Sequence, residues 1–234
     1  MLFDRVETQL KGSNFPTLIQ DMFGGVLSNE IVSKGCDHYS ETEENFLSIS
    51  LTVKSKKNIY QSLDTMIKGD TLDGDNAYFC ERCSKKVSAV KRVSLKRLPD
   101  HLIVTLKRFE FDFEKMMKLK VNDYCEFPLE LNLREYSHHY LRQQESKKQL
   151  DEEESQSNDY YQYVLKGVVV HSGYADSGHY YSFIQDRGSG KWLEFNDTIV
   201  RDFNPDELPE EAFGGDYGGY DMKEKIKNAY MLIY

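Results

Sequence analysis

Short segments in which apolar and polar residues alternate recur along this chain and constrain its fold more than any other feature. Residues 46–53 and 87–98 alternate with a period of two, as strands with one buried face do. Residues 59–67 instead carry apolar side chains at helical spacing. Further strand candidates, several of them separated by glycine-containing turns, lie at 101–109, 127–133, 161–171, 179–184, 192–195 and 229–234. The pattern predicts an α+β fold dominated by an antiparallel sheet.

Two segments depart from this strand pattern. Residues 2–10 have helical spacing, but no Ser, Thr, Asp or Asn precedes them as an N-cap. We expect the chain to begin inside a helix whose start lies in another segment, with a frayed first turn as the alternative. Residues 137–160 are strongly polar and suit either a disordered insertion or an exposed charged helix. Because strand signals resume directly afterwards, we expect a disordered insertion within a domain.

Composition narrows the class of protein and its compartment. The 234 residues include 30 Lys and Arg but 39 Asp and Glu, and the resulting net charge of −9 weighs against a nucleic-acid partner. No apolar run approaches the roughly 20 residues of a transmembrane helix, and the first residues lack the regions of a signal peptide. Four cysteines are too few for a disulfide framework. We therefore expect a protein of the cytoplasm or nucleus with no membrane partner.

Cysteine spacing indicates a possible zinc site. Cys80 and Cys83 form a C-x-x-C knuckle, which can hold one metal ion with two thiolates. Cys36 and His38 supply two further ligand types, although Ser33 stands where a paired knuckle would have its first thiolate. The functional interpretation is a structural zinc ion that joins the tips of two hairpins. The alternative is a decayed site in which the cysteines pack as small apolar side chains.

Residues 171–183 suggest part of a catalytic site. His171 and His179 flank a glycine-containing loop, and Asn196 and Asp197 follow an aromatic strand 17 residues further on. A thiol protease needs a histidine base beside a cysteine, and an Asn or Asp that orients the imidazole. Two adjacent antiparallel strands could bring His179 and Asn196 together. Chemistry alone leaves the alternative open that a histidine at a strand start is structural.

A family resemblance adds weight to the catalytic interpretation. The motif Gly-x-x-x-His-Ser-Gly-x-x-x-x-Gly-His-Tyr at 167–180 resembles the histidine box of the ubiquitin-specific proteases, and so does the segment 192–197. Segments that agree with the family in the same order lie at 80–83, 98–109, 127–128 and 228–234. Segments that resemble the very large members of the family in particular lie at 57–60, 70–76 and 213–215. The likeness covers nearly the whole chain except the polar stretch.

The resemblance implies a papain-like fold described as fingers, palm and thumb. The fingers would span about residues 28–100 and the palm about residues 101–136 and 160–234. The thumb would be largely absent, because nothing here matches the segments that normally precede residues 2–10. The implied activity is thiol-dependent hydrolysis of the peptide or isopeptide bond after the C-terminal Gly-Gly of ubiquitin. The implied partners are ubiquitin and ubiquitinated proteins, and no catalytic cofactor is implied.

The resemblance also implies roles for individual residues. His179 would be the general base and then the general acid, Asn196 would orient it, and Asp197 would assist or substitute for Asn196. His171 would be structural. The residues expected to bind the ubiquitin tail, in the loop and in the channel for Gly-Gly, are Ser172, Gly173, Gly178 and Tyr180.

The nucleophile of the family has no counterpart in these residues. The expected Gly-Asn-x-Cys segment is missing, and Cys125 has neither the preceding Asn nor a metal-like spacing. We therefore expect a missing segment to supply the catalytic cysteine and this chain alone to be inactive. One alternative is a catalytically dead ubiquitin-binding remnant. A second is a zinc-ribbon protein that binds nucleic acid through the basic segment 85–107.

Overall fold

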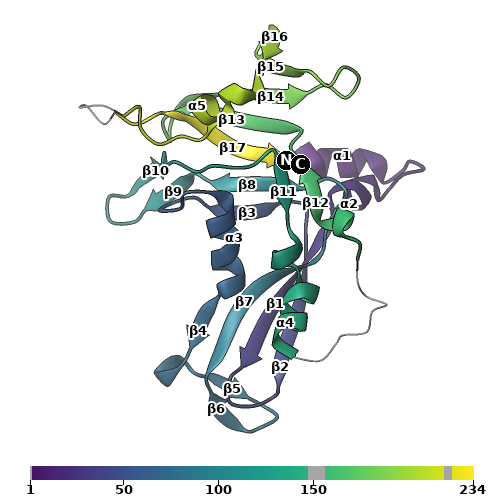
Figure 1. The fold of residues 1–234 in the computed structure, drawn as a ribbon, viewed down its shortest axis with the longest axis vertical. Helices are drawn as coiled ribbons and strands as arrows, with labels where there is room; N and C mark the ends of the chain where they lie inside the picture. Colours follow the sequence, from purple (N-terminus) through teal and green to yellow (C-terminus); the bar gives the residue numbers. More distant parts are fainter. Residues whose placement is uncertain (1, 147–155, 219–222) are drawn as a thin grey trace. The chain divides into compact units, whose positions relative to one another are not determined.

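The computed structural model describes residues 2–146, 156–218 and 223–234. The chain forms two compact units (Figure 1). Unit 1 comprises Met1–Leu47, Leu63–Asp100 and Asn132–Gln162, and unit 2 comprises Ser48–Ser62, His101–Leu131 and Tyr163–Tyr234. Among the described residues, no helix has the length and apolar character needed to cross a lipid bilayer.

Unit 1 is built on a four-stranded antiparallel sheet with the order β2-β1-β7-β4. These strands are β1 (Gly25–Ser33), β2 (Tyr39–Phe46), β4 (Asp70–Leu72) and β7 (Ala89–Arg97). A separate hairpin joins β5 (Tyr78–Cys80) to β6 (Lys85–Val87), and the 3-10 helix η1 (Gly74–Asn76) precedes it. The expected N-terminal helix is present as α1 (Leu2–Leu10), and it contacts α2 (Leu18–Phe23) through an aromatic pair, Phe3 and Phe23.

The polar stretch after residue 137 differs from the expected disordered insertion. The 3-10 helix η2 (Arg134–Tyr136) precedes this stretch, which begins with α4 (His138–Ser146) and ends in η4 (Asn158–Tyr161), while residues 147–155 lie outside the described residues. Two side chains of α4 hold the helix on the sheet, because His138 and Glu145 pair with the buried Glu30 and Arg92. The expectation of disorder missed these ion pairs, since their partners lie far away in the sequence.

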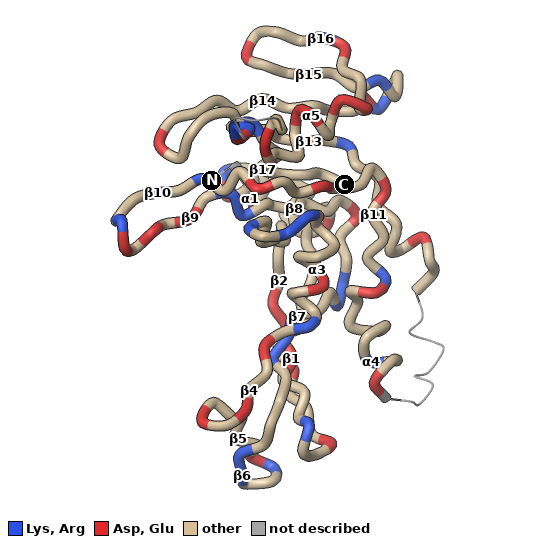
Figure 2. Tube along the Cα trace, turned by 60° about the vertical axis from the view of Figure 1, so that its left-hand side comes forward, with Lys and Arg blue, Asp and Glu red and all other residues tan. Residues whose placement is uncertain are grey.

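In unit 1, the charged residues of β1 and β2 are acidic and those of β7 are basic, so opposite charges lie on neighbouring strands (Figure 2). Two of the basic residues of β7 are paired with acidic ones: Lys96 contacts Glu41 and Glu43, and Arg92 contacts Glu30. This pairing weakens a nucleic-acid interpretation of residues 85–107, because Arg92 and Lys96 already have acidic partners.

Unit 2 is built on a seven-stranded sheet with the order β16-β15-β14-β13-β17-β8-β3. Its strands are β3 (Ile49–Thr52), β8 (Ile103–Lys107), β13 (Gly167–Gly173), β14 (Gly178–Gln185), β15 (Trp192–Asn196), β16 (Ile199–Phe203) and β17 (Lys227–Ile233). All pairs are antiparallel except β3 with β8, so the predicted α+β fold with mainly antiparallel sheet is confirmed. Residues 49–52, expected among the fingers, belong to this sheet because β3 pairs with the distant β8.

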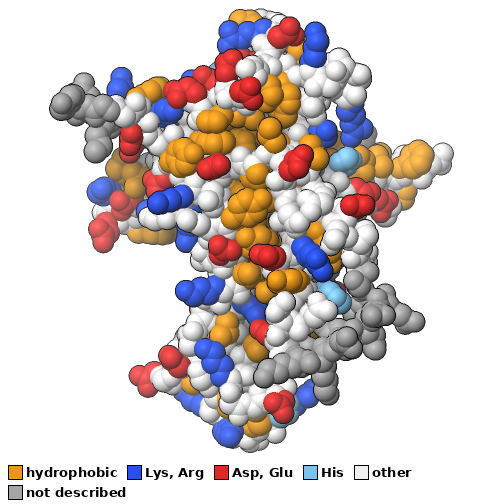
Figure 3. Space-filling view, in the orientation of Figure 1, with side chains coloured by type: hydrophobic (Ala, Val, Ile, Leu, Met, Phe, Trp, Pro, Cys, Tyr) orange, Lys and Arg blue, Asp and Glu red, His pale blue; other side chains and the backbone are white. Residues whose placement is uncertain are grey.

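Smaller elements complete the two units. One hairpin pairs β9 (Phe109–Asp112) with β10 (Met117–Lys120), and β11 (Glu130–Asn132) pairs with β12 (Gln162–Val164). The remaining helices of the described residues are α3 (Ile59–Lys68), which confirms the helical spacing of residues 59–67, then η5 (Pro205–Glu207) and α5 (Leu208–Ala212). Apolar side chains gather on one face over the region of α5, β14 and β17 (Figure 3).

Candidate active site and metal centre

His179 lies at the start of β14, where the β13–β14 hairpin closes. Its register partner is Ser172, and Gly173 pairs with Gly178 at the hairpin mouth. The adjacent strand β15 ends with Asn196, and the His179 Nε2 atom lies 2.6 Å from the Asn196 Oδ1 atom. The expectation that neighbouring strands bring these two side chains together is therefore met. The His179 side chain remains 45% exposed, so one side of the imidazole is open to a reaction partner.

The hydrogen bond to Asn196 determines which imidazole nitrogen can act as a base. An amide oxygen only accepts hydrogen bonds, so Nε2 of His179 must carry the proton that it donates to Oδ1. In the neutral ring the lone pair then lies on Nδ1. The arrangement thus presents Nδ1 as a proton acceptor.

Asp197 lies in the turn between β15 and β16 and is a weaker partner of the imidazole. Its Oδ2 atom is 4.0 Å from His179 Nε2, and its side chain is 78% exposed. Its backbone is left-handed, with φ of 52°, as the tight turn requires. The structure therefore brings Asn196 into hydrogen-bond contact with His179 and leaves Asp197 just beyond it.

His171 is packed beneath the loop that closes the hairpin. It is 4% exposed and contacts the rings of Phe109 and Tyr180 at centroid distances of 5.1 and 4.7 Å. Burial, and then the charge of Lys120, lowers its pKa. A Cβ atom at Gly178 would lie 2.1 Å from His171 Nε2, so only glycine fits there.

The other residues expected to bind substrate surround the same loop. Gly173 has φ of +124°, a conformation suited to glycine. Tyr180 is 50% exposed and packs against Tyr230. Ser172 lies opposite His179 in the register. These residues are neighbours of His179 in the sequence or in the strand register, and their role in binding substrate stays a prediction.

Lys120 is a site residue that the sequence analysis missed. Its Nζ atom donates to the backbone carbonyls of His171, Gly173 and Ile226 at 3.0, 3.1 and 2.6 Å. Burial, aided by the charge of Arg108, lowers its pKa to about 8. Two of these bonds hold the end of β13 on both sides of Ser172, the residue opposite His179, and the third holds the residue before β17. A lysine at a strand end carries no sequence signal for this role.

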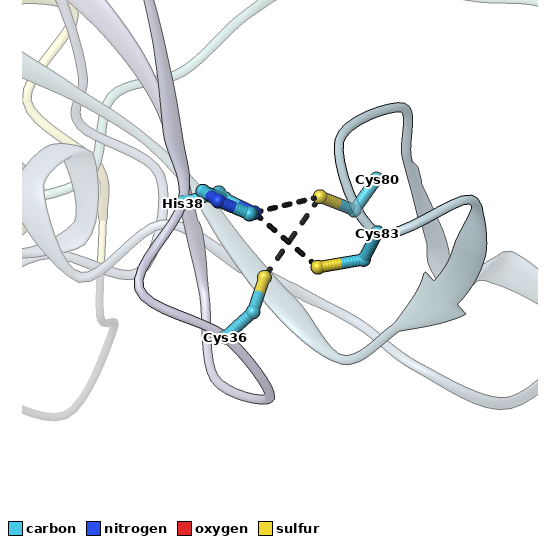
Figure 4. Close-up of side chains that lie close together, drawn as sticks. All are labelled: Cys36, His38, Cys80 and Cys83. Carbon is cyan, nitrogen blue, oxygen red and sulfur yellow. Dashed lines mark hydrogen bonds between the residues drawn. The ribbon is translucent and has the colours of Figure 1, made fainter.

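The four predicted metal ligands meet at the tips of two hairpins in unit 1 (Figure 4). Cys36 and His38 lie in the β1–β2 turn, and Cys80 and Cys83 lie at the β5–β6 turn. The Cys36 and Cys80 sulfurs are 3.8 Å apart, and His38 Nδ1 lies 3.5 and 3.3 Å from the sulfurs of Cys80 and Cys83. All four ligand atoms lie within 4.8 Å of one another.

These distances fit a zinc ion. Tetrahedral zinc with Zn–S of about 2.3 Å and Zn–N of about 2.1 Å requires ligand atoms about 3.5–3.8 Å apart. A backbone hydrogen bond from His38 lowers the pKa of Cys36 to about 7, whereas burial, and then the neighbouring sulfurs, raise the pKa of Cys83 to about 11. A divalent cation would stabilise the thiolate forms of Cys80 and Cys83 beside that of Cys36. Cys36, His38, Cys80 and Cys83 thus form a possible structural zinc site.

Cys125 has a different environment. It is fully buried, and burial raises its pKa to about 11. A thiol of this kind stays protonated at neutral pH and is a poor nucleophile. Cys125 is therefore a packed residue of the core.

Comparison with known proteins agrees with this geometry. The family model described as ubiquitin carboxyl-terminal hydrolase matches residues 1–234. The chain is similar to human ubiquitin carboxyl-terminal hydrolase 34, with 41% identity over 92% of this chain and 7% of that protein. It is also similar to human ubiquitin carboxyl-terminal hydrolase 24, with 37% identity over all of this chain and 10% of that protein. The chain therefore spans at most a tenth of these relatives.

Solved structures support the same grouping. The SAGA Ubp8/Sgf11/Sus1/Sgf73 DUB module bound to ubiquitin aldehyde has a TM-score of 0.72 and 28% identity, covering all of this chain and 48% of that chain. A SAGA DUB module with a variant of Ubp8, bound to monoubiquitin, has a TM-score of 0.69 and 31% identity, covering 93% of this chain and 41% of that one. The predicted papain-like fold of the ubiquitin-specific protease type is confirmed, and the chain belongs to the ubiquitin carboxyl-terminal hydrolase family.

Proposed function

We propose that this chain contributes the general base to a deubiquitinase active site. The reaction is hydrolysis of the peptide or isopeptide bond after the C-terminal Gly-Gly of ubiquitin in protein conjugates. The observation that carries the proposal is the 2.6 Å contact between His179 Nε2 and Asn196 Oδ1, which leaves Nδ1 as the acceptor. We further propose that the protein works in the cytoplasm or nucleus, where its four free cysteines stay reduced.

The nucleophile comes from a polypeptide segment outside residues 1–234. Of the four cysteines, three share the metal cluster and the fourth is buried with a raised pKa. A cysteine placed at His179 Nδ1 would lose its proton to that nitrogen and attack the terminal glycine carbonyl of ubiquitin. The protonated imidazole would then give the proton to the departing amine, forming an acyl-enzyme and releasing the target protein. A water molecule, deprotonated by the same imidazole, would hydrolyse the thioester and free ubiquitin.

Substrate recognition is proposed for the hairpin mouth. Ser172, Gly173 and Gly178 line the backbone opposite and beside His179, and Tyr180 offers a half-exposed ring. A Gly-Gly tail suits such a site because residues without a Cβ can pass close to a backbone and an aromatic wall. The ubiquitin bound in the two similar structures supports ubiquitin as the partner. Asp197, 4.0 Å from Nε2, would assist Asn196.

The test joins this chain to the cysteine-bearing segment of a relative such as hydrolase 34. The chain alone should not release a fluorophore from a ubiquitin C-terminal amide. The fusion should release it, and His179→Ala should reduce kcat/KM at least about 100-fold. Fluorophore release by the chain alone, or an unchanged kcat/KM in the fusion that carries His179→Ala, would refute the proposal. A fusion that binds labelled ubiquitin without cleaving it would favour the alternative of a non-catalytic ubiquitin-binding protein.

A further inference from the structure

The Asn196 side chain has a second partner besides the imidazole. Its Nδ2 atom donates to Glu194 Oε1 at 3.2 Å. The other carboxylate oxygen, Oε2, accepts from Arg201 Nε at 2.8 Å and from Arg201 Nη2 at 2.7 Å. Glu194 is 5% exposed, so this carboxylate is directed into the sheet and both of its oxygens are used.

Strand register places these four side chains in one row. Glu194 and Asn196 are two residues apart on β15 and therefore share a face. Glu194 pairs with Phe183 on β14, which puts His179 on that same face, and it pairs with Arg201 on β16. The row runs from the imidazole through an amide and a carboxylate to a guanidinium across three neighbouring strands.

The row bears on catalysis because an amide has two orientations of nearly equal shape. In one, Oδ1 faces His179 and the base is Nδ1, as observed. In the other, Nδ2 faces His179, and the imidazole must then accept at Nε2 and carry its proton on Nδ1. A carboxylate only accepts hydrogen bonds, so Glu194 pairs with the NH₂ side of Asn196 and excludes the second orientation.

We propose that Glu194 is a positioning residue for the His179–Asn196 pair, which it orients through the Asn196 amide while Arg201 holds its carboxylate. The tautomer of His179 then depends on a residue that contacts neither the imidazole nor the substrate. The effect of Glu194 on the tautomer stands by itself, and only its effect on the rate of hydrolysis rests on the proposed function. The competing explanation is a cross-strand ion pair between β15 and β16 that stabilises the sheet and does nothing for the histidine.

The two explanations differ in the tautomer of His179, which long-range ¹H–¹⁵N NMR of the histidine side chains reports in the chain itself. We expect the wild-type protein at neutral pH to show His179 protonated on Nε2. Glu194→Leu should raise the share of the Nδ1-protonated form to at least a third, because Asn196 is then free to rotate. Glu210→Gln, which removes the carboxylate of the Lys225 ion pair elsewhere in unit 2, should leave the tautomer unchanged.

A second variant keeps the test valid if Glu194→Leu does not fold. Glu194→Gln keeps the shape but offers both an oxygen and an NH₂ group, so it should weaken the tautomer preference partially, with Trp192 fluorescence reporting an intact sheet. An unchanged tautomer in a folded variant overturns the proposal. In the catalytically complete protein, Glu194→Leu should lower kcat about tenfold with KM changed less than twofold. A shifted tautomer in Glu194→Leu, together with a catalytically complete wild-type protein that shows no hydrolysis, would uphold this inference and refute the proposed function.

Discussion

Glu30 provides the sharpest test of how unit 1 is stabilised. Its carboxylate is fully buried on β1 and accepts from Arg92 Nη2 at 2.8 Å, Ser94 Oγ at 2.6 Å and His138 Nδ1 at 2.8 Å. The substitution Glu30→Gln keeps the volume and removes the charge, while Arg92 keeps its second partner Glu145. The variant therefore isolates the contribution of the ionised carboxylate.

The size of the effect follows from the pKa of Glu30. Burial alone would raise this pKa, but the hydrogen bonds from His138, Ser94 and Arg92 outweigh it and lower the pKa from 4.5 to about 2. Since 1.4 kcal/mol corresponds to a tenfold change in proton binding, the ionised carboxylate stabilises the folded state by about 3 kcal/mol. Because the folded-state pKa is the lower one, this stabilisation is present above pH 4.5 and is lost as the pH falls towards 2.

Urea unfolding followed by far-ultraviolet circular dichroism measures the effect. Glu30→Gln should lower the free energy of unfolding by about 3 kcal/mol at pH 7 but by only about 1.5 kcal/mol at pH 3. Glu135→Gln, at an exposed position in η2, is the matched control and should change it by less than about 0.5 kcal/mol. A loss for Glu30→Gln that is equal at both pH values, or below about 0.5 kcal/mol at pH 7, would refute the reasoning.

Three further predictions concern the metal centre and the hairpin that carries the imidazole. Purified protein should hold one zinc ion per chain by atomic absorption, Cys80→Ser should lose it, and Cys125→Ser should keep it; zinc retained by Cys80→Ser would contradict the assigned site. Gly178→Ala should lower the melting temperature by several degrees, because its Cβ would lie 2.1 Å from His171 Nε2, and an unchanged melting curve would contradict this close approach. Lys120→Met should destabilise the protein by about 2 kcal/mol in urea unfolding, since three carbonyls lose their shared donor, and a neutral effect would show that water replaces it.

Much of unit 2 was predictable because its determinants are local. Residues 167–196 form successive antiparallel strands whose turns carry glycine, and alternation with turn residues is enough to specify such hairpins. The same local order placed His179 beside Asn196. The parallel pairing of β3 with β8 was not predictable, because its two partners lie more than 50 residues apart and alternation does not identify a distant partner.

Residues of the candidate sites also differ in whether the local sequence identifies them. Cys80 and Cys83 are identified by their spacing, and the structure brings Cys36 and His38 to them from a separate turn. Glu194 and Lys120 carry no such signal, since a single charged residue on a strand is usually solvent-facing. Their roles depend on what lies opposite in the register, which the sequence alone does not state.

The most direct test of the central claim uses the native protein that contains this chain and a ubiquitin probe with a C-terminal electrophile. The probe forms a covalent bond with the cysteine that acts as nucleophile, and peptide mapping locates the adduct. We predict an adduct on a cysteine outside residues 1–234, and slow labelling when His179 is replaced by alanine. An adduct on Cys36, Cys80, Cys83 or Cys125, or labelling at an unchanged rate without His179, would contradict this prediction.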